Sequence, residues 1–191
     1  SSMDNPDEGE VVFEGIDVYK LSESELSKFR LNKMGFVFQN SQMLKNLSIF
    51  DNIILPGMVA KRESIEVVRA RATELMSKMG IEDIKDRDIR EVSGGQLQRA
   101  AICRAMINSP EILFMDEPTG ALNSEAASQV MEILKKLNQE GISIMLVTHD
   151  AKMASMAKKV IYIKDGKLAG EIKLSNEKEA LAELDLWLKT I

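Results

Sequence analysis

Two adjacent carboxylates that follow a run of apolar residues are the strongest chemical signal in the chain. Ile112–Met115 predicts a central strand, and Asp116 and Glu117 stand at its C-terminal end. In open parallel sheets, ligands bind outside that end of the strands. One carboxylate there can hold Mg²⁺ through water, and the other can polarise an attacking water. Apolar strands that end in acids also occur by chance, so a structural role stays open at this point.

A second signal is Ser93-Gly94-Gly95-Gln96, which stands directly before a predicted helix. Adjacent glycines let the backbone approach a ligand closely. The start of the helix has N–H groups without backbone partners and carries a partial positive charge. These features predict an anion site suited to a γ-phosphate. The alternative is a flexible hinge joined to a helix cap.

Two further polar residues follow apolar strands. His149 is the single histidine of the chain and comes after the predicted strand Ile142–Thr148. It can hydrogen-bond a γ-phosphate or orient a water. Gln39 follows the predicted strand residues Met34–Phe38 and can reach a metal or a water. A lone histidine is more often structural, but its expected place beside the two carboxylates favours chemistry.

Alternating strands and helices must position these residues, which indicates an α/β fold with a parallel sheet. The block from Gln39 to Arg99 reads as a helical insertion on that sheet. The predicted strands are Glu10–Phe13, Ile16–Tyr19, Met34–Phe38, Ile112–Asp116, Ile142–Thr148 (a second buried strand), Val160–Lys164 and Lys167–Ile172, the last two joined by the turn Asp165-Gly166. The predicted helices are Ser22–Arg30 (capped by Ser22 with Glu25), Ile49–Ala60 (disturbed at Pro56-Gly57), Glu63–Met79, Ser93–Asn108, Ser124–Glu140, Ala151–Ala157 and Asn176–Ile191.

The order and spacing of these motifs resemble the ATP-binding cassette (ABC) family from about Asp4 to about Ile172. Phe38-Gln39 is similar to its Q-loop, Val92–Gln96 to its LSGGQ signature, Met115–Thr119 to Walker B, Gly120–Asn123 to the D-loop and Thr148–Asp150 to the H-loop. Phe36–Gln39 followed by Asn52–Pro56 resembles exporters of lipoproteins, macrolides or antimicrobial peptides.

The resemblance implies a RecA-like P-loop NTPase core with a parallel sheet, a helical subdomain insertion and a partial antiparallel β-subdomain. Residues 1–39 are expected to be the remnant of the β-subdomain with the Q-loop strand. Residues 40–99 form the helical signature subdomain, 100–174 the RecA-like core and 175–191 a C-terminal helix.

The resemblance also assigns roles. Glu117 and His149 are expected to be catalytic, and Gln39 and Asp116 to hold Mg²⁺. The expected nucleotide-binding residues are Gln39, Ser93, Gly94, Gly95, Gln96, Asp116 and Asn123. Asn123 stands where the family usually has Asp, so its hydrogen bonds can survive while charge-dependent coupling weakens. The implied ligands are ATP and Mg²⁺.

One family motif, the P-loop, does not occur. The sequence G-x-x-x-x-G-K-[ST] is found nowhere, and the Gly166-Lys167 pair continues with Leu168 in a hairpin. The chain is therefore expected to begin after the P-loop, with the first strands and Walker A missing. Taken alone it is predicted to be inactive as an ATPase. The alternative is a non-catalytic ABC-fold module that completes or regulates a partner's ATP site.

Composition limits the partners. The formal net charge is −5, which argues against a nucleic-acid binder driven by a basic face and disfavours an ABC protein of translation or repair. Every apolar run is too short to span a membrane, and Cys103 is the single cysteine. The resemblance implies a second ATP-binding subunit in a head-to-tail dimer, and a transmembrane permease docked on the helical subdomain around Ser41–Leu55. The implied location is cytoplasmic, peripheral on the inner face of the cell membrane.

Overall fold

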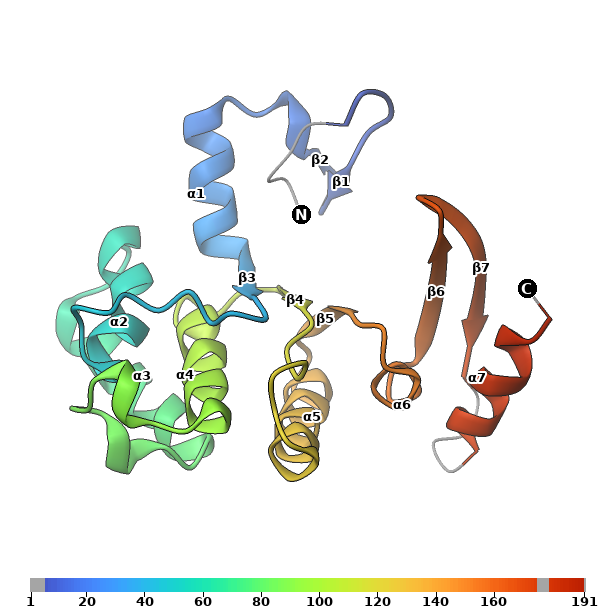
Figure 1. Ribbon diagram of the computed structural model, residues 1–191. Coiled ribbons are helices and arrows are strands. Elements are labelled where there is room, and N and C mark those ends of the chain that lie inside the picture. The colour runs from blue at the N-terminus through green and yellow to red at the C-terminus, as the bar shows by residue number, and fades with distance from the viewer. Residues whose placement is uncertain (1–5, 175–178, 191) are drawn as a thin grey trace. The chain divides into compact units, whose positions relative to one another are not determined.

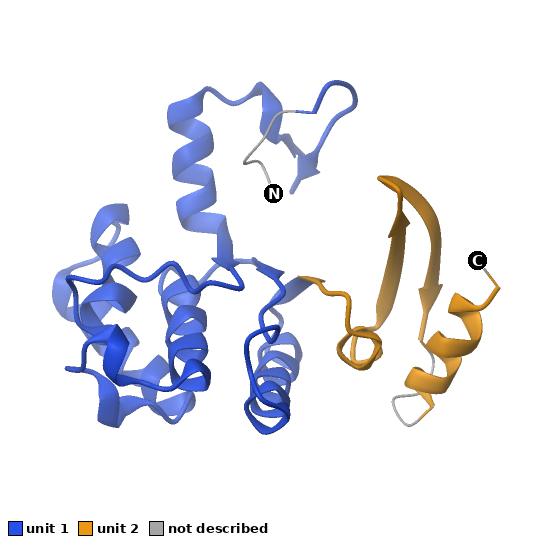
Figure 2. Cartoon of the chain, in the orientation of Figure 1, with its two compact units in different colours: residues 1–145 blue, residues 146–191 orange. Residues whose placement is uncertain are grey.

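The computed structural model describes residues 6–174 and 179–190, which form two compact units. Residues 1–145 belong to the first unit and residues 146–191 to the second (Figure 2). The predicted site residues other than His149 fall in the first unit. Each unit is described by itself below.

The first unit begins with a small antiparallel hairpin of β1 (Val12–Phe13) and β2 (Ile16–Asp17). Its turn, Glu14-Gly15, has positive φ angles of 51° and 80°. The predicted second strand is wrong beyond Asp17, because Val18–Lys20 forms a 3₁₀ turn. The cause is local: the Asp17 carboxylate accepts a hydrogen bond from the Tyr19 N–H and caps that turn.

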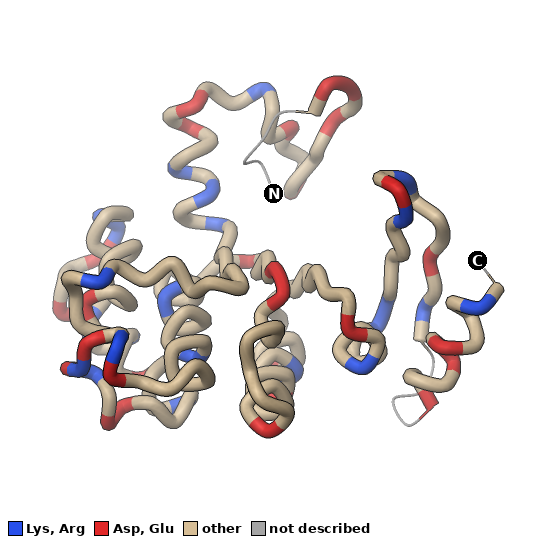
Figure 3. Tube along the Cα trace, in the orientation of Figure 1, with Lys and Arg blue, Asp and Glu red and all other residues tan. Residues whose placement is uncertain are grey.

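Helix α1 (Glu23–Lys33) leads from this hairpin into the sheet. The predicted capping box is confirmed, since the Ser22 hydroxyl accepts from the Glu25 N–H and the Glu25 carboxylate accepts from the Ser22 N–H. Acidic residues occupy the first turn and basic residues the last, as Figure 3 shows. This order suits the helix dipole. The helix runs directly into β3 (Met34–Val37), so it fixes where that strand begins.

The helical insertion consists of α2 (Ile49–Ala60), α3 (Ile65–Lys78) and α4 (Gly94–Met106), which pack on one another (Figure 1). Two 3₁₀ turns, Glu82–Ile84 and Ile89–Glu91, connect α3 to α4. The expected disturbance at Pro56-Gly57 does not break α2, which continues to Ala60, although its buried apolar side chains all precede the proline. The largest fully buried side chains of this region are Ile49, Ile53, Met76, Ile81, Ile84, Ile102 and Ile107.

Three strands form a sheet in the order β3, β4 (Ile112–Asp116) and β5 (Ser143–Val147). Strands β3 and β4 are parallel, with Phe36 opposite Phe114 and Val37 opposite Met115. Leu113 and Met115 are fully buried, while the Phe36 and Phe114 rings stack on the other face with centroids 5.4 Å apart. The parallel sheet that strand–helix alternation predicted is confirmed for this pair.

Strand β5 (Ser143–Val147) follows α5 (Ser124–Gln139), whose inner face is buried at Val130, Met131 and Leu134. The prediction of a second buried strand is wrong, because exposed and half-buried residues alternate along it. Met145 is 51% exposed. The physical reason is that successive side chains of a strand point to opposite faces of the sheet, and the face of β5 that carries Met145 and Val147 is exposed.

The second unit contains α6 (Ala151–Ala154), the hairpin of β6 (Lys159–Lys164) and β7 (Lys167–Lys173), and α7 (Ala180–Leu188). The predicted hairpin turn is confirmed by positive φ angles of 50° at Asp165 and 73° at Gly166. Tyr162 meets Trp187 edge to face at 6.5 Å, so α7 packs on the hairpin. The predicted last helix lies partly outside the described residues, at 176–178 and 191.

Candidate functional site

Asp116 and Glu117 lie where β4 ends and a tight turn begins. Asp116 is exposed, and Glu117 adopts a φ angle of 45°, which is rare for a residue with a side chain. The Gly120 N–H donates to the Glu117 carbonyl at 3.1 Å, which closes the turn. Strain of this kind persists only where the surroundings hold it, and it gathers at functional sites. The backbone geometry therefore singles out the second carboxylate.

Gln39 lies against this turn. The distance from the Gln39 Nε2 atom to the position that a Cβ on Gly120 would occupy is 3.1 Å. The parallel register of β3 and β4 explains this approach, because both strands end at the same edge. The structure thus brings the Gln39 amide to the turn that follows Asp116 and Glu117. Sequence reasoning missed Gly120 as the residue that makes room for the amide, although a glycine two residues beyond Pro118 was a visible signal.

The Ser93–Gln96 segment forms the start of α4. The Ser93 hydroxyl accepts from the Gln96 N–H at 3.3 Å, and the Gln96 side-chain carbonyl accepts from the Ser93 N–H at 3.0 Å. The N–H groups of Gly94 and Gly95 stand in the first turn, where a helix offers no backbone acceptor. Ser93 and Gly94 are exposed. The turn can therefore present a hydroxyl and backbone N–H groups to an anion.

The two glycines also have a packing role that the sequence did not reveal. A Cβ on Gly95 would lie 3.1 Å from the Ala126 Cβ, and one on Gly94 would lie 3.4 Å from the Leu122 Cδ2. The start of α4 is thus held close to the start of α5. Asn123 caps α5, because its side-chain carbonyl accepts from the Ala126 N–H at 2.8 Å. The predicted nucleotide-binding residue Asn123 therefore has a structural task as well.

His149 belongs to the second unit, where it follows β5 and precedes the helix cap Asp150. The Asp150 carboxylate accepts from the Lys152 N–H at 2.7 Å and from the Met153 N–H at 3.2 Å, which starts α6 at once. His149 is exposed. Its grouping with Asp116 and Glu117 stays a prediction.

The residues at the end of β4 suit Mg²⁺ in ligand type. The Asp116 carboxylate and the Gln39 side-chain carbonyl are hard oxygen donors, which this ion prefers. Within residues 6–174 and 179–190, no group of three or more His, Cys, Asp or Glu is arranged to hold a metal. Mg²⁺ commonly binds through one or two protein oxygens plus substrate phosphates and water. The donor set therefore fits an ion that arrives with a phosphate ligand.

Comparison with known proteins decides the family. The sequence model described as "ABC transporter" matches residues 1–120. This chain belongs to the ABC transporter family. The cassette is 41% identical over its whole length to the macrolide export ATP-binding/permease protein MacB of Campylobacter jejuni, of which it spans 29%. It is 40% identical over 86% of its length to the lipoprotein-releasing system ATP-binding protein LolD of Bdellovibrio bacteriovorus, of which it spans 75%.

A solved structure agrees with the fold. The dimeric post-hydrolysis state of the ATP-binding cassette MJ0796, bound to ADP and Pi, superposes with a TM-score of 0.82 at 39% identity. The match covers 91% of this ABC cassette and 76% of that chain. The predicted RecA-like α/β fold and the exporter-type resemblance are thus confirmed. Among the described residues, no helix has the length and apolar character needed to cross a membrane.

Proposed function

We propose that this ABC cassette is the ATP-binding and ATP-hydrolysing subunit of a transporter that powers export through a membrane permease. The observation that carries the proposal is the approach of the Gln39 amide to the strained turn at Glu117. Asp116 and Gln39 would hold Mg²⁺, which would neutralise phosphate charge, and Glu117 would orient and polarise a water. His149 belongs to the other compact unit, and its role toward the γ-phosphate is taken from the family resemblance alone.

The first turn of α4 acts on the nucleotide of a second subunit. Its exposed Ser93 hydroxyl, together with the N–H groups of Gly94 and Gly95, contacts the γ-phosphate in a head-to-tail dimer. Support comes from the dimeric state of the related MJ0796 cassette.

The sequence as given lacks the phosphate-binding lysine and glycine-rich loop, so we infer that this chain alone binds Mg-ATP weakly and does not hydrolyse it. A P-loop supplies a cradle of N–H groups and a cation for the triphosphate. Without them, the negative charges of Asp116 and Glu117 repel phosphate.

The permease docks on the helical subdomain around Ser41–Leu55, which places the cassette on the cytoplasmic face of the cell membrane. MacB supports this reading, because that relative is an ATP-binding/permease protein. A second candidate function is a non-catalytic module that completes or regulates a partner's ATP site. The complete capping box at Ser93 and Gln96 favours it, since this element needs no P-loop in its own chain.

Calorimetry and sedimentation test the proposal. Titration of Mg-ATP into the chain alone should show no micromolar binding. With Mg-ATP and an intact MJ0796 cassette made hydrolysis-deficient, the chain should form a mixed dimer. Ser93→Arg should abolish that dimer. Ser64→Arg controls for an added arginine at an exposed helix start, that of α3, although Ser64 makes no side-chain cap hydrogen bond. Equal loss of the dimer in both variants, or a dimer that forms without ATP, contradicts the proposal.

A further inference from the structure

The segment that follows Gln39 has little structure of its own. Residues 40–48 form neither helix nor strand beyond one isolated bridge at Ser48. Gln42 has a φ angle of 49°, which is costly for a residue with a side chain. Such a segment keeps one conformation only if other parts of the chain hold it.

Arg104 of helix α4 provides the hold nearest to Gln39. Its Nη1 donates to the Gln42 carbonyl at 2.8 Å and its Nη2 donates to the Ser41 carbonyl at 2.5 Å. A planar guanidinium fits two adjacent acceptors in a way that an ammonium cannot. Burial lowers the pKa of the guanidinium, and within the described ranges no carboxylate pairs with it. The half-buried guanidinium therefore has the two backbone carbonyls as its hydrogen-bond acceptors.

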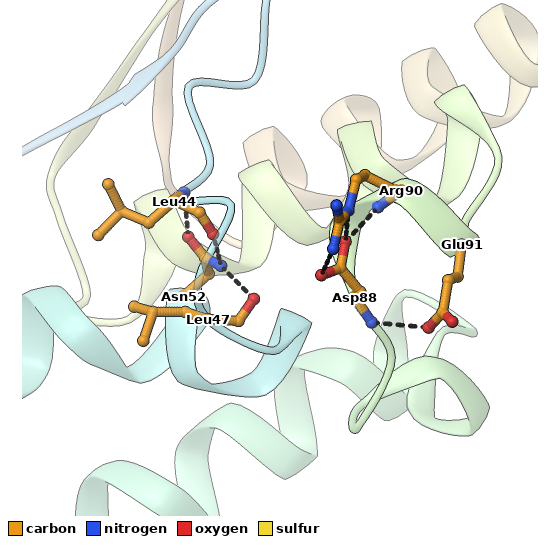
Figure 4. Close-up of polar contacts among 6 residues, drawn as sticks. All are labelled: Leu44, Leu47, Asn52, Asp88, Arg90 and Glu91. Atoms are coloured by element: carbon orange, nitrogen blue, oxygen red, sulfur yellow. Dashed lines mark hydrogen bonds and ion pairs between the residues drawn. The ribbon is translucent and has the colours of Figure 1, made fainter.

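Asn52 of helix α2 holds the middle of the segment. Its fully buried side chain accepts from the Leu44 N–H at 2.7 Å and donates to the carbonyls of Leu44 and Leu47 (Figure 4). The far end is joined to the loop before α4 by the bridge between Ser48 and Asp88. Asp88 is itself fixed by two hydrogen bonds from the Arg90 guanidinium, also visible in Figure 4. Asn52 and Asp88 thus hold the middle and the far end of the segment, and Arg104 holds the end next to Gln39.

From these contacts we infer that Arg104 is a positioning residue, which sets where the Gln39 amide lies relative to the Glu117 turn. The first carbonyl that Arg104 holds is that of Ser41, two residues after Gln39, so the backbone between them has little freedom to move. We call the two hydrogen bonds from Arg104 to the Ser41 and Gln42 carbonyls the clamp. Arg104 belongs to the same helix as Ser93, about 16 Å along its axis at 1.5 Å per residue. One rigid helix thus carries the turn that faces a partner's nucleotide and the clamp that places Gln39. The functional meaning rests on the proposed role of Gln39, but the clamp itself does not.

Hydrogen exchange and spin labelling on the chain without nucleotide test the clamp. Arg104→Met removes both hydrogen-bond donors. Arg104→Lys keeps the positive charge but lacks the planar pair of donors that reaches two carbonyls at once. Arg71→Met is the matched control, because Arg71 of α3 also donates to a backbone carbonyl, that of Ile107, at 2.9 Å. A spin label on Gln39→Cys reports mobility at the site. It attaches selectively, since Cys103 is fully buried and burial raises its thiol pKa to about 12.

In Arg104→Met we expect peptides over residues 40–47 to exchange about tenfold faster or more, as loss of two charge-assisted hydrogen bonds implies. The label should become more mobile, with no change at α2 and α3. Arg104→Lys should give a smaller local increase and serves if the Met variant does not fold. Unchanged exchange, faster exchange spread over the whole unit, or the same local effect in Arg71→Met overturns the inference. Hydrogen exchange and spin-label mobility are measured without nucleotide or a second subunit. Failure of the chain to form a mixed dimer with an ATP-loaded cassette therefore counts only against the proposed function.

Discussion

At Gly35, β3 lies so close to α4 that adding a single methyl group there should destabilise the fold. A Cβ on Gly35 would lie 2.4 Å from the Leu113 Cδ2 and 2.7 Å from the Ala105 carbonyl oxygen. The second contact is with helix backbone and cannot be relieved by a rotamer change. Overfilling a packed core costs about 1–3 kcal/mol, and replacing Gly by Ala returns about 0.4–1 kcal/mol through the unfolded chain. We expect Gly35→Ala to destabilise the chain by about 2 kcal/mol.

Gly57→Ala is the matched control for this prediction. Its Cβ would lie 2.7 Å from the Val68 Cγ1, which is a side-chain atom, and Gly57 stands inside helix α2. A helix interior gains about 1 kcal/mol from Gly to Ala, which offsets the clash. In thermal unfolding followed by circular dichroism, Gly35→Ala should lower Tm by about 4–8 °C, and Gly57→Ala by less than about 3 °C. Equal shifts in the two variants, or no shift for Gly35→Ala, would refute the reasoning from backbone contact.

Three further predictions concern single side chains. Ser93→Ala should lower stability by about 1 kcal/mol through loss of the α4 cap, whereas Ser64→Ala, at a helix start without a cap hydrogen bond, should change it little in urea unfolding. Cys103, whose thiol pKa is raised to about 12 by burial, should not react with a thiol reagent near pH 8 until the chain unfolds; fast labelling of folded protein would contradict its burial. Hydrogen bonds from the Arg90 side chain, and then its N–H, hold the Asp88 pKa at about 2, below its usual value of 3.8. That stabilisation is present above about pH 4 and is lost as pH falls through about 2, so the urea midpoint of Asp88→Asn should be less sensitive to acid than that of the parent chain.

Much of the fold was predictable because its strongest signals are local. Strand β4 and helix α2 have the predicted bounds, since apolar runs and helix caps mark them in the sequence. The errors arose where the packing of a sheet face, or a local side-chain hydrogen bond, overrides the pattern of apolar residues in the sequence. Strand β5 reads as buried from its apolar residues, but its side chains alternate between an exposed face and a half-buried face of the sheet. Val18–Lys20 reads as strand until the Asp17 carboxylate caps a turn there.

The candidate site was predictable in its residues and only partly in its arrangement. The apolar runs predicted that Gln39, Asp116 and Glu117 follow strands, and the parallel register of β3 and β4 puts those strand ends at one edge of the sheet. The approach of the Gln39 amide to Gly120 was not predicted. The hydrogen bond from Arg104 to the Ser41 carbonyl joins residues 63 positions apart, so no local sequence pattern predicts it. An arginine in a helix is normally read as a solvated side chain, so its contact with carbonyls needs coordinates to be seen.

The glycines before α4 show why the ligand-binding interpretation must be tested at the serine. Gly95 is required by the intrachain contact with Ala126, so loss of function on replacing it would follow from displaced helices alone. Ser93 is different, because its side chain is exposed and its hydroxyl accepts from Gln96 while its own proton stays available to donate. A substitution that keeps the cap but fills the space outside it therefore separates binding from folding. Ser93→Asp keeps an N-cap acceptor and adds a negative charge at the proposed phosphate contact. Its folded stability together with its ATP-dependent association distinguishes a helix cap from an anion site.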